Sequence, residues 1–225
     1  MKYLIVVAHP DDETLGVGGT MYKLSKDNEV DVAILSANVN ARKNKSTSLD
    51  QDLKKALDIL GVQNFYKGNF ENIKMNVEPH IEVVKFIEKC ICESEPDVVI
   101  THHPSDTNND HTITSYGTQA AIRLFQRREG THGIKKLFFM EVPSSTEWSV
   151  DSSSNRFQPN YFFEINQDGL EKKIEALSAY KGVMRAYPHP RSKEAISGLA
   201  SYRGAQSGLL LAEALELVFE RVEND

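Results

Sequence analysis

The chain has few cysteines and no long apolar run. Its two cysteines, Cys90 and Cys92, stand two residues apart on one predicted helix, so their side chains point in different directions and cannot form a disulfide framework. We expect two buried thiols in a reducing compartment. No stretch approaches the roughly 20 apolar residues of a membrane span, and the apolar run at residues 3–8 is too short for a signal peptide. A cytoplasmic location is the expectation.

An excess of basic residues is also missing. The net charge is -6 and the pI is near 5.7, which argues against a nucleic-acid partner because such proteins present a basic face. The chain has 225 residues, of which 40% are hydrophobic. That is enough for one well-packed domain and scarcely enough for two. Without an internal repeat or a domain-splitting linker, we expect one domain over residues 1–225.

Apolar runs and amphipathic segments alternate along the chain. This alternation predicts an α/β fold with a Rossmann-like, open, mostly parallel sheet flanked by helices. The region 143–159 lacks periodicity and is predicted to be a surface loop or a lid over the site. The predicted strands cover residues 3–7, 30–35, 98–100, 138–142 and 161–165. The predicted helices cover 14–26, 49–60, 77–94, 112–128 and 170–180, with a last one through Leu209 to Val218 that is either core packing or an oligomer surface.

The most informative segment is Ala8-His9-Pro10-Asp11-Asp12-Glu13, directly after the first predicted strand. Open α/β sheets bind ligands at the carboxyl ends of their strands. Successive side chains of an extended segment point in different directions, so His9 and Asp12 could bind one ion while Asp11 faces the substrate. Taken alone, such carboxylates are most often part of a solvated turn and helix N-cap.

A second polar cluster, residues 101–111, follows the apolar run 98–100 and ends in Asp110-His111. Two parallel strands that each end in His and Asp residues can deliver them to one crevice. Three protein ligands with water form the usual catalytic zinc site, although Fe²⁺, Co²⁺ or Mn²⁺ accepts the same donors. The two clusters together therefore predict a metal centre.

Three motifs give the chain a resemblance to a known family. A-H-P-D-D-E stands complete at residues 8–13, and H-P-x-D-x-H-x-D-H matches at 103–111 except that Asn108 replaces the internal His. A third likeness lies at 188–195 and 202–204. The chain resembles the PIG-L/LmbE-like, zinc-dependent N-deacetylases of N-acetylglucosaminyl conjugates, which include the deacetylases of the mycothiol and bacillithiol pathways.

The resemblance implies a role for each matching position. The metal ligands would be His9, Asp12 and His111. Asp11 would be the general base that takes a proton from the attacking water, and Asp110 would sit behind the ligands. Asn108 cannot carry a proton as the family's His does, but its amide can still donate a hydrogen bond to an oxyanion.

Substrate contacts are expected from Arg42, His189 and Arg191. Arg42 lies in a basic loop after the second predicted strand, where family relatives use an Arg on the substrate, although such loops are usually solvated. His189 and Arg191 lie beside prolines that either form a rigid turn or present both side chains to a phosphate, carboxylate or sugar hydroxyl. His189 is also a candidate second proton donor.

These observations predict a zinc-dependent hydrolase that removes the N-acetyl group from an amino-sugar conjugate and releases acetate and a free amine. Zinc polarises the carbonyl and lowers the water pKa to about 7, and one carboxylate can act as base and then acid. One alternative is an amidase for a larger acyl group, and another is a metal-dependent sugar-binding protein without turnover. The partner is a small amino-sugar conjugate, and family relatives often form a homo-oligomer.

Overall fold

Strand β1, Lys2–Val7, lies in the middle of a seven-stranded sheet whose order is β3-β2-β1-β4-β5-β7-β6. The computed structural model describes residues 1–37, 49–150 and 156–222. The apolar run Leu4–Val7 is fully buried, as expected of a central strand covered on both faces. The other strands are β2 Glu29–Ile34, β3 Asn64–Lys67, β4 Val98–His102, β5 Lys136–Met140, β6 Tyr161–Glu164 and β7 Ala212–Glu220.

The first five strands are parallel, and β7 runs antiparallel to both β5 and β6. Strand β1 pairs with β4 up to Val6 and Thr101, so the two strands end side by side. The segments that follow them, which carry both sequence motifs, therefore meet at one edge of the sheet. This arrangement confirms the predicted open, mostly parallel α/β fold.

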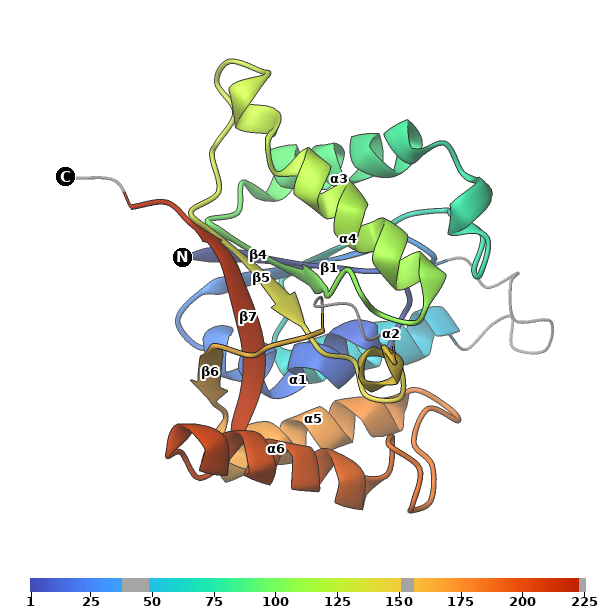
Figure 1. Cartoon of the computed structure of the whole chain (residues 1–225), viewed down its shortest axis with the longest axis vertical. Coiled ribbons are helices and arrows are strands. Elements are labelled where there is room, and N and C mark those ends of the chain that lie inside the picture. The colour runs from blue at the N-terminus through green and yellow to red at the C-terminus, as the bar shows by residue number, and fades with distance from the viewer. Residues whose placement is uncertain (38–48, 151–155, 223–225) are drawn as a thin grey trace.

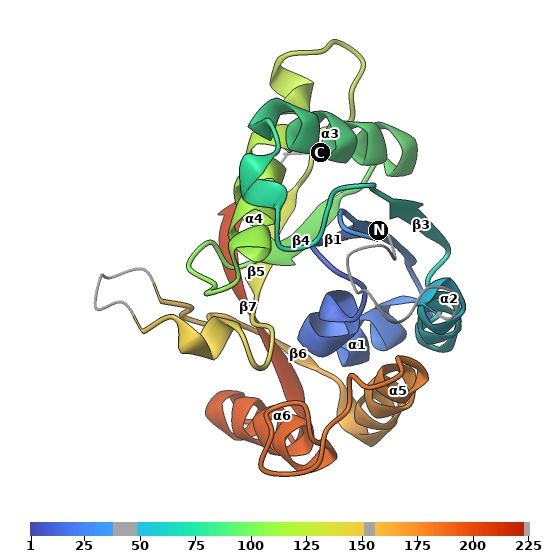
Figure 2. The same cartoon turned by 90° about the vertical axis from the view of Figure 1, so that its right-hand side faces the viewer.

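Helices cover both faces of the sheet (Figures 1 and 2). Side chains alternate along β1, so Ile5 and Val7 join the core on the side of α1, α2, α5 and α6, while Leu4 and Val6 join the core under α3 and α4. The helices are α1 Asp12–Leu24, α2 Leu49–Leu60, α3 His80–Ser94, α4 Asn109–Ala121, α5 Asn166–Ala179 and α6 Lys193–Ser207. Short 3-10 turns are η2 Met75–Val77, η3 Leu124–Gln126 and η4 Thr146–Trp148.

Helix α1 bends at Val17, where φ is -134° and ψ is 27°. Beyond the bend, the backbone N–H groups of Gly19 and Thr20 donate to the Glu213 carboxylate on β7 at 3.0 and 2.7 Å. Lys173 on α5 donates to the same carboxylate at 2.6 Å, and both side chains are nearly fully buried. This ion pair ties α1 to α5 and to the sheet.

The predicted helix through Leu209 to Val218 is wrong, because this region forms strand β7. The helix lies earlier, as α6, and ends at Gly208, whose φ of 76° is a left-handed C-cap. Residues 212–215 are all buried, and they include Glu213, whose carboxylate is paired with Lys173. Of the two roles expected for this segment, core packing applies to residues 212–215, whereas the outer half of β7 exposes Val218 and Phe219 by about 40%.

Other boundaries also differ from the prediction. The helix containing His111 begins at Asn109 and ends at Ala121, rather than covering 112–128, and the short edge strand β3 was not predicted. Cys90 is buried as expected, but Cys92 is exposed. The predicted loop 143–159 contains η4, and its residues 151–155 lie outside the described part of the chain.

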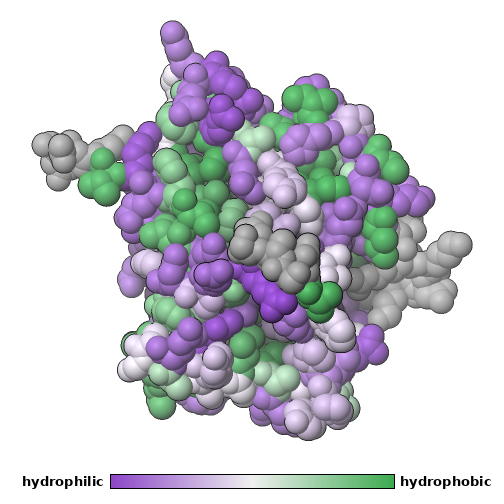
Figure 3. Space-filling view, in the orientation of Figure 1, coloured by the Kyte–Doolittle hydropathy of each residue, from purple (hydrophilic) through white to green (hydrophobic). Residues whose placement is uncertain are grey.

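Within the described residues, no helix combines the length and apolar character needed to cross a membrane. The face drawn in Figure 3 mixes hydrophilic and hydrophobic residues.

Candidate metal centre and active site

The turn after β1 places His9 and Asp12 against each other. The backbone N–H of His9 donates to Asp12 Oδ2 at 2.9 Å, and the N–H of Asp12 donates to the His9 carbonyl at 3.3 Å. Between them, Asp11 has a φ of 101° at the N-cap of α1. A non-glycine residue in this region costs about 1–3 kcal/mol and persists only where its surroundings hold it.

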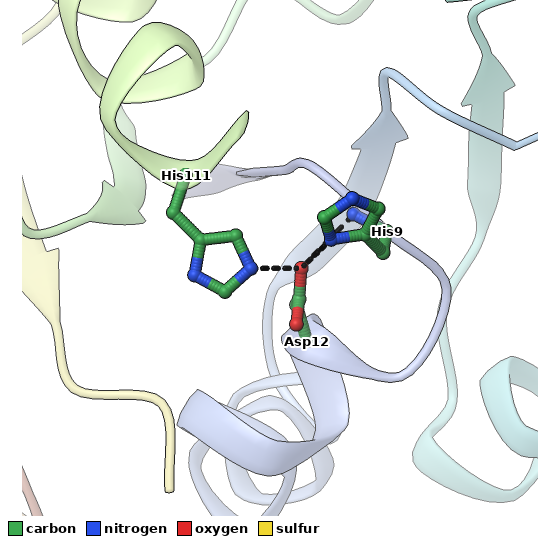
Figure 4. A group of neighbouring side chains, drawn as sticks. All are labelled: His9, Asp12 and His111. Atoms are coloured by element: carbon green, nitrogen blue, oxygen red, sulfur yellow. Dashed lines mark hydrogen bonds and ion pairs between the residues drawn. The ribbon is translucent and has the colours of Figure 1, made fainter. Parts of the chain in front are cut away.

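His9, Asp12 and His111 form one buried group of donor atoms (Figure 4). Asp12 Oδ2 lies 3.2 Å from His9 Nδ1 and 3.1 Å from His111 Nε2. All three donor atoms lie within 4.8 Å of one another. The residues predicted to be metal ligands are therefore brought together, His9 and Asp12 from the β1 end and His111 from the first turn of α4.

A carboxylate lies behind each imidazole of this group. The second nitrogen of His9, Nε2, is 3.0 Å from Asp110 Oδ2, and the second nitrogen of His111, Nδ1, is 3.1 Å from Asp106 Oδ2. Metal-binding histidines are commonly oriented in this way, with the other ring nitrogen held by a carboxylate. The prediction placed Asp110 behind the ligands but assigned no such role to Asp106.

The two outer carboxylates are themselves fixed by hydrogen bonds. Asp110 accepts the backbone N–H groups of Ile73 at 2.6 Å and Met75 at 3.1 Å. Asp106 accepts hydrogen bonds from the hydroxyls of Ser145 and Thr146, the latter at 2.7 Å. The first part of the predicted loop is thus anchored to the site through Asp106.

Each charged group of the site changes the pKa of its neighbours. Burial opposes the protonated form of both ligand imidazoles, but hydrogen bonds to carboxylates dominate and raise the pKa of His9 to about 9. Likewise, Asp12 and Asp106 outweigh burial and raise the pKa of His111 to about 10. Burial would raise the pKa of Asp12, but His111 and His9 hold it well below its usual range. Without a metal, the two protonated imidazoles thus offset part of the negative charge of Asp12, Asp106 and Asp110.

This donor set fits a divalent metal ion. Two imidazoles and one carboxylate are typical of catalytic zinc sites, which keep a further position for water. A divalent cation would replace the two protons with the same charge, and each ligand imidazole already has its outer carboxylate. His9, Asp12 and His111 are therefore the residues that would hold the metal.

Sequence reasoning missed His102, which is fully buried beside the group. Its ring stacks on His111 with centroids 3.9 Å apart and 16° between the planes. Its Nε2 accepts the Ala8 N–H at 2.9 Å, so Nδ1 carries the proton. Burial and the neighbouring His111 lower the pKa of His102 to about 3, and the ring is neutral. Its position at the end of β4 was the available signal.

A second group, His102, Asp106 and His111, also has donor atoms within 4.8 Å of one another. The lone pairs of an imidazole lie in the plane of its ring, and the two rings are nearly parallel. Their lone pairs therefore do not converge on one ion. The geometry favours the group that contains His9 and Asp12.

Asp11 directly precedes the expected ligand Asp12 and contacts the Arg191 guanidinium, with 3.4 Å between its Oδ2 and Arg191 Nη1. Arg191 Nε also donates to Ser144 Oγ at 2.7 Å. The positive charge of the guanidinium attracts the Asp11 carboxylate and limits its movement. Arg191, predicted from the sequence to contact substrate, is thus placed against the expected general base.

The other predicted positions differ in placement. Asn108 is the N-cap of α4, and its Oδ1 accepts the Asp110 N–H at 3.0 Å, which directs the amide oxygen into the cap. His189 is exposed, and its Nδ1 accepts the Arg191 N–H at 3.0 Å, as in the rigid-turn interpretation. Arg42 lies outside the described residues.

Two curated deacetylases are similar to this chain in sequence. A probable N-acetyl-alpha-D-glucosaminyl L-malate deacetylase 2 from Bacillus anthracis is 27% identical over 189 residues, covering 79% of each chain. A diacetylchitobiose deacetylase from Thermococcus kodakarensis is 25% identical over 242 residues, covering 96% of this chain and 83% of that protein.

Structural similarity extends to enzymes of another class. The 4-carboxy-2-hydroxymuconate hydratase GalB from Pseudomonas putida superposes with a TM-score of 0.75 at 21% identity, covering 100% of this chain and 99% of the hydratase. At that identity the likeness shows the shared fold alone, so the reaction has to be argued from the site. The family model described as GlcNAc-PI de-N-acetylase matches residues 4–122, more than half of the chain, and the protein belongs to this PIG-L family.

Proposed function

We propose that the protein is a zinc-dependent hydrolase that removes the N-acetyl group from an N-acetylglucosaminyl conjugate and releases acetate and a free amine. The observation that carries the proposal is the buried convergence of His9, Asp12 and His111, with the buried Asp11 next to Asp12 in the chain. Two relatives named as deacetylases of N-acetylated sugars support the substrate class.

The metal would supply Lewis acidity toward the amide carbonyl and lower the pKa of water. Asp11 takes a proton from the attacking water as its oxygen bonds to the acetyl carbon. When the C–N bond breaks, the same carboxyl returns that proton to the leaving amine. Arg191 lies against Asp11 and holds its carboxylate in place by charge attraction.

Asn108 stands where the family motif has a His. Because its Oδ1 caps α4, its amide NH₂ is the end directed away from the cap. This group can donate a hydrogen bond to an oxyanion but cannot transfer a proton. We therefore assign stabilisation of the oxyanion to Asn108 and both proton transfers to Asp11, with Arg42 and His189 as further substrate contacts.

The substrate proposal is tested by measuring release of acid from a panel of N-acetylglucosaminyl conjugates and of matched conjugates with longer acyl groups. Acetate release that exceeds release of the longer acids supports the deacetylase. Preference for the longer acyl groups supports the amidase instead, because pocket size decides the ratio.

The binding-protein alternative predicts metal and sugar binding without product. Its specific mark is recovery of turnover in Asn108→His, which restores the imidazole of the family motif. Turnover in the wild type excludes this alternative. Elemental analysis of the protein as purified separates zinc from Fe²⁺, Co²⁺ and Mn²⁺.

We further propose one deacetylase domain over residues 1–225 and a cytoplasmic location. Measuring the mass of the protein in solution tests whether it forms a homo-oligomer.

A further inference from the structure

Glu13, the last residue of the first motif, is fully buried and lies outside the donor set of the metal. Both of its carboxylate oxygens are used. Oε2 accepts the backbone N–H of Asp11 at 3.1 Å, while Oε1 accepts the hydroxyls of Thr14 at 2.6 Å and Tyr180 at 2.7 Å. Glu13 thus joins the backbone of the expected general base to two hydroxyls.

Tyr180 brings a distant element to this point. It is the C-cap residue of α5, 2% of its surface is exposed, and it is 167 positions from Glu13 in the sequence. Helix α5 packs beside α1 in both views of the fold (Figures 1 and 2). The phenol hydroxyl therefore fixes Glu13 from a rigid neighbouring helix.

The backbone of Asp11 has to be held by its neighbours, because a φ of 101° is unfavourable for any residue with a Cβ. A return to negative φ would rotate the Asp11 N–H away from Glu13 and swing the carboxylate away from Arg191. The hydrogen bond from the Asp11 N–H to Glu13 opposes this rotation on the backbone side. The ion pair with Arg191 opposes the same rotation by holding the Asp11 carboxylate.

We propose that Glu13 and Tyr180 are positioning residues that hold Asp11 in its left-handed conformation, with its carboxylate aimed at the reacting water. The statement about the reacting water rests on the proposed function. Small misplacements of a reacting group can cost up to about a hundredfold in rate, so the network is expected to act on turnover rather than on binding.

The test is Tyr180→Phe, which removes one hydroxyl and keeps the ring. A matched control is Tyr66→Phe on the edge strand β3, because the Tyr66 hydroxyl also faces a buried carboxylate, that of Asp31 on β2, at 3.4 Å. Tyr180→Phe is expected to lower kcat about tenfold or more, with KM within about twofold and metal content unchanged. The control is expected to leave kcat unchanged.

Three results overturn the proposal: an unchanged kcat, a loss that appears only in KM, or a loss of kcat that is equal in both variants. The combination with Asp11→Asn adds a second criterion. If Tyr180 acts through Asp11, the double variant keeps the residual rate of Asp11→Asn, whereas multiplied losses contradict the inference.

A crystal structure of Tyr180→Phe gives a readout that needs no activity. The inference predicts that Asp11 leaves its positive φ or that its carboxylate moves away from Arg191. An unmoved Asp11 contradicts it. If the wild type releases no acid from any conjugate, the proposed function fails, and this structural comparison still decides whether Tyr180 and Glu13 position Asp11.

Discussion

Binding of a divalent metal to the metal-free protein is expected to release two protons near neutral pH. Metal-binding imidazoles must be neutral, whereas the pKa of His9 is about 9 and that of His111 about 10 in the metal-free site. Both rings are therefore protonated below pH 8. Asp12, whose pKa lies well below its usual range, is already ionised and contributes no proton.

The magnitude follows from proton linkage. Because both pKa values are raised, each ring holds its proton up to the raised value, and a higher pH favours the metal. Because two protons are released, the apparent association constant of the metal rises about a hundredfold per pH unit between pH 7 and 8. With ordinary pKa values near 6.5, the same interval would show almost no contribution from the histidines.

The assay is competition with a chelator of known pH-dependent affinity, combined with calorimetry in buffers of different ionisation enthalpy. Solvent at the metal can add at most about one proton, so release of one proton or fewer at pH 7.5 refutes the reasoning. Asp110→Asn is expected to reduce the release, because it removes the carboxylate that raises the pKa of His9. His80→Ala, which changes an exposed histidine on α3, is the control and is expected to leave the release unchanged.

Three substitutions test other contacts. Asp106→Asn is expected to weaken metal binding about 10- to 100-fold, because it loosens the orientation of His111, and wild-type affinity in the chelator competition would contradict this. Glu213→Ala is expected to lower the free energy of unfolding by about 3–5 kcal/mol in chemical denaturation, because it leaves Lys173 buried without its partner. Adding Lys173→Met should recover part of that loss, and a loss below about 1 kcal/mol would oppose the argument. Arg191→Ala is expected to lower kcat/KM on the order of tenfold through the general base, and unchanged steady-state kinetics would refute its role.

The sequence predicted the part of the site that follows from strand ends. His9 and Asp12 come directly after a fully apolar run, and His111 lies nine residues after His102, the last residue of the next strand in the sheet. Since parallel strands end at one edge, the meeting of these segments was predictable.

Several residues that surround the metal ligands could not be predicted from the sequence. Asp106 reaches His111 only because the chain turns back between β4 and α4, and His102 reaches the same ring across the end of the strand. Arg191 contacts Asp11 from 180 positions away. These are tertiary contacts, which residue spacing does not specify.

The error at the C-terminal strand has a local cause. Glu213, Glu216 and Glu220 stand three and four residues apart among apolar residues, which is the spacing of one face of a helix. In the strand Glu213 is instead buried and paired with Lys173, so the pattern of charges misled the prediction. The left-handed Gly208 was the available boundary signal. Read as a C-cap, it ends the preceding helix before the apolar run begins.

The most direct test of the central claim is acetate release from N-acetylglucosaminyl conjugates by the zinc-loaded wild type, the chelator-treated wild type and zinc-loaded Asp11→Asn. We expect rapid release by the first sample and, in the other two, only a small residual rate, with zinc content equal in the first and third. Release that persists after chelation, or in Asp11→Asn at the wild-type rate, would contradict the assignment of the metal centre or of its general base.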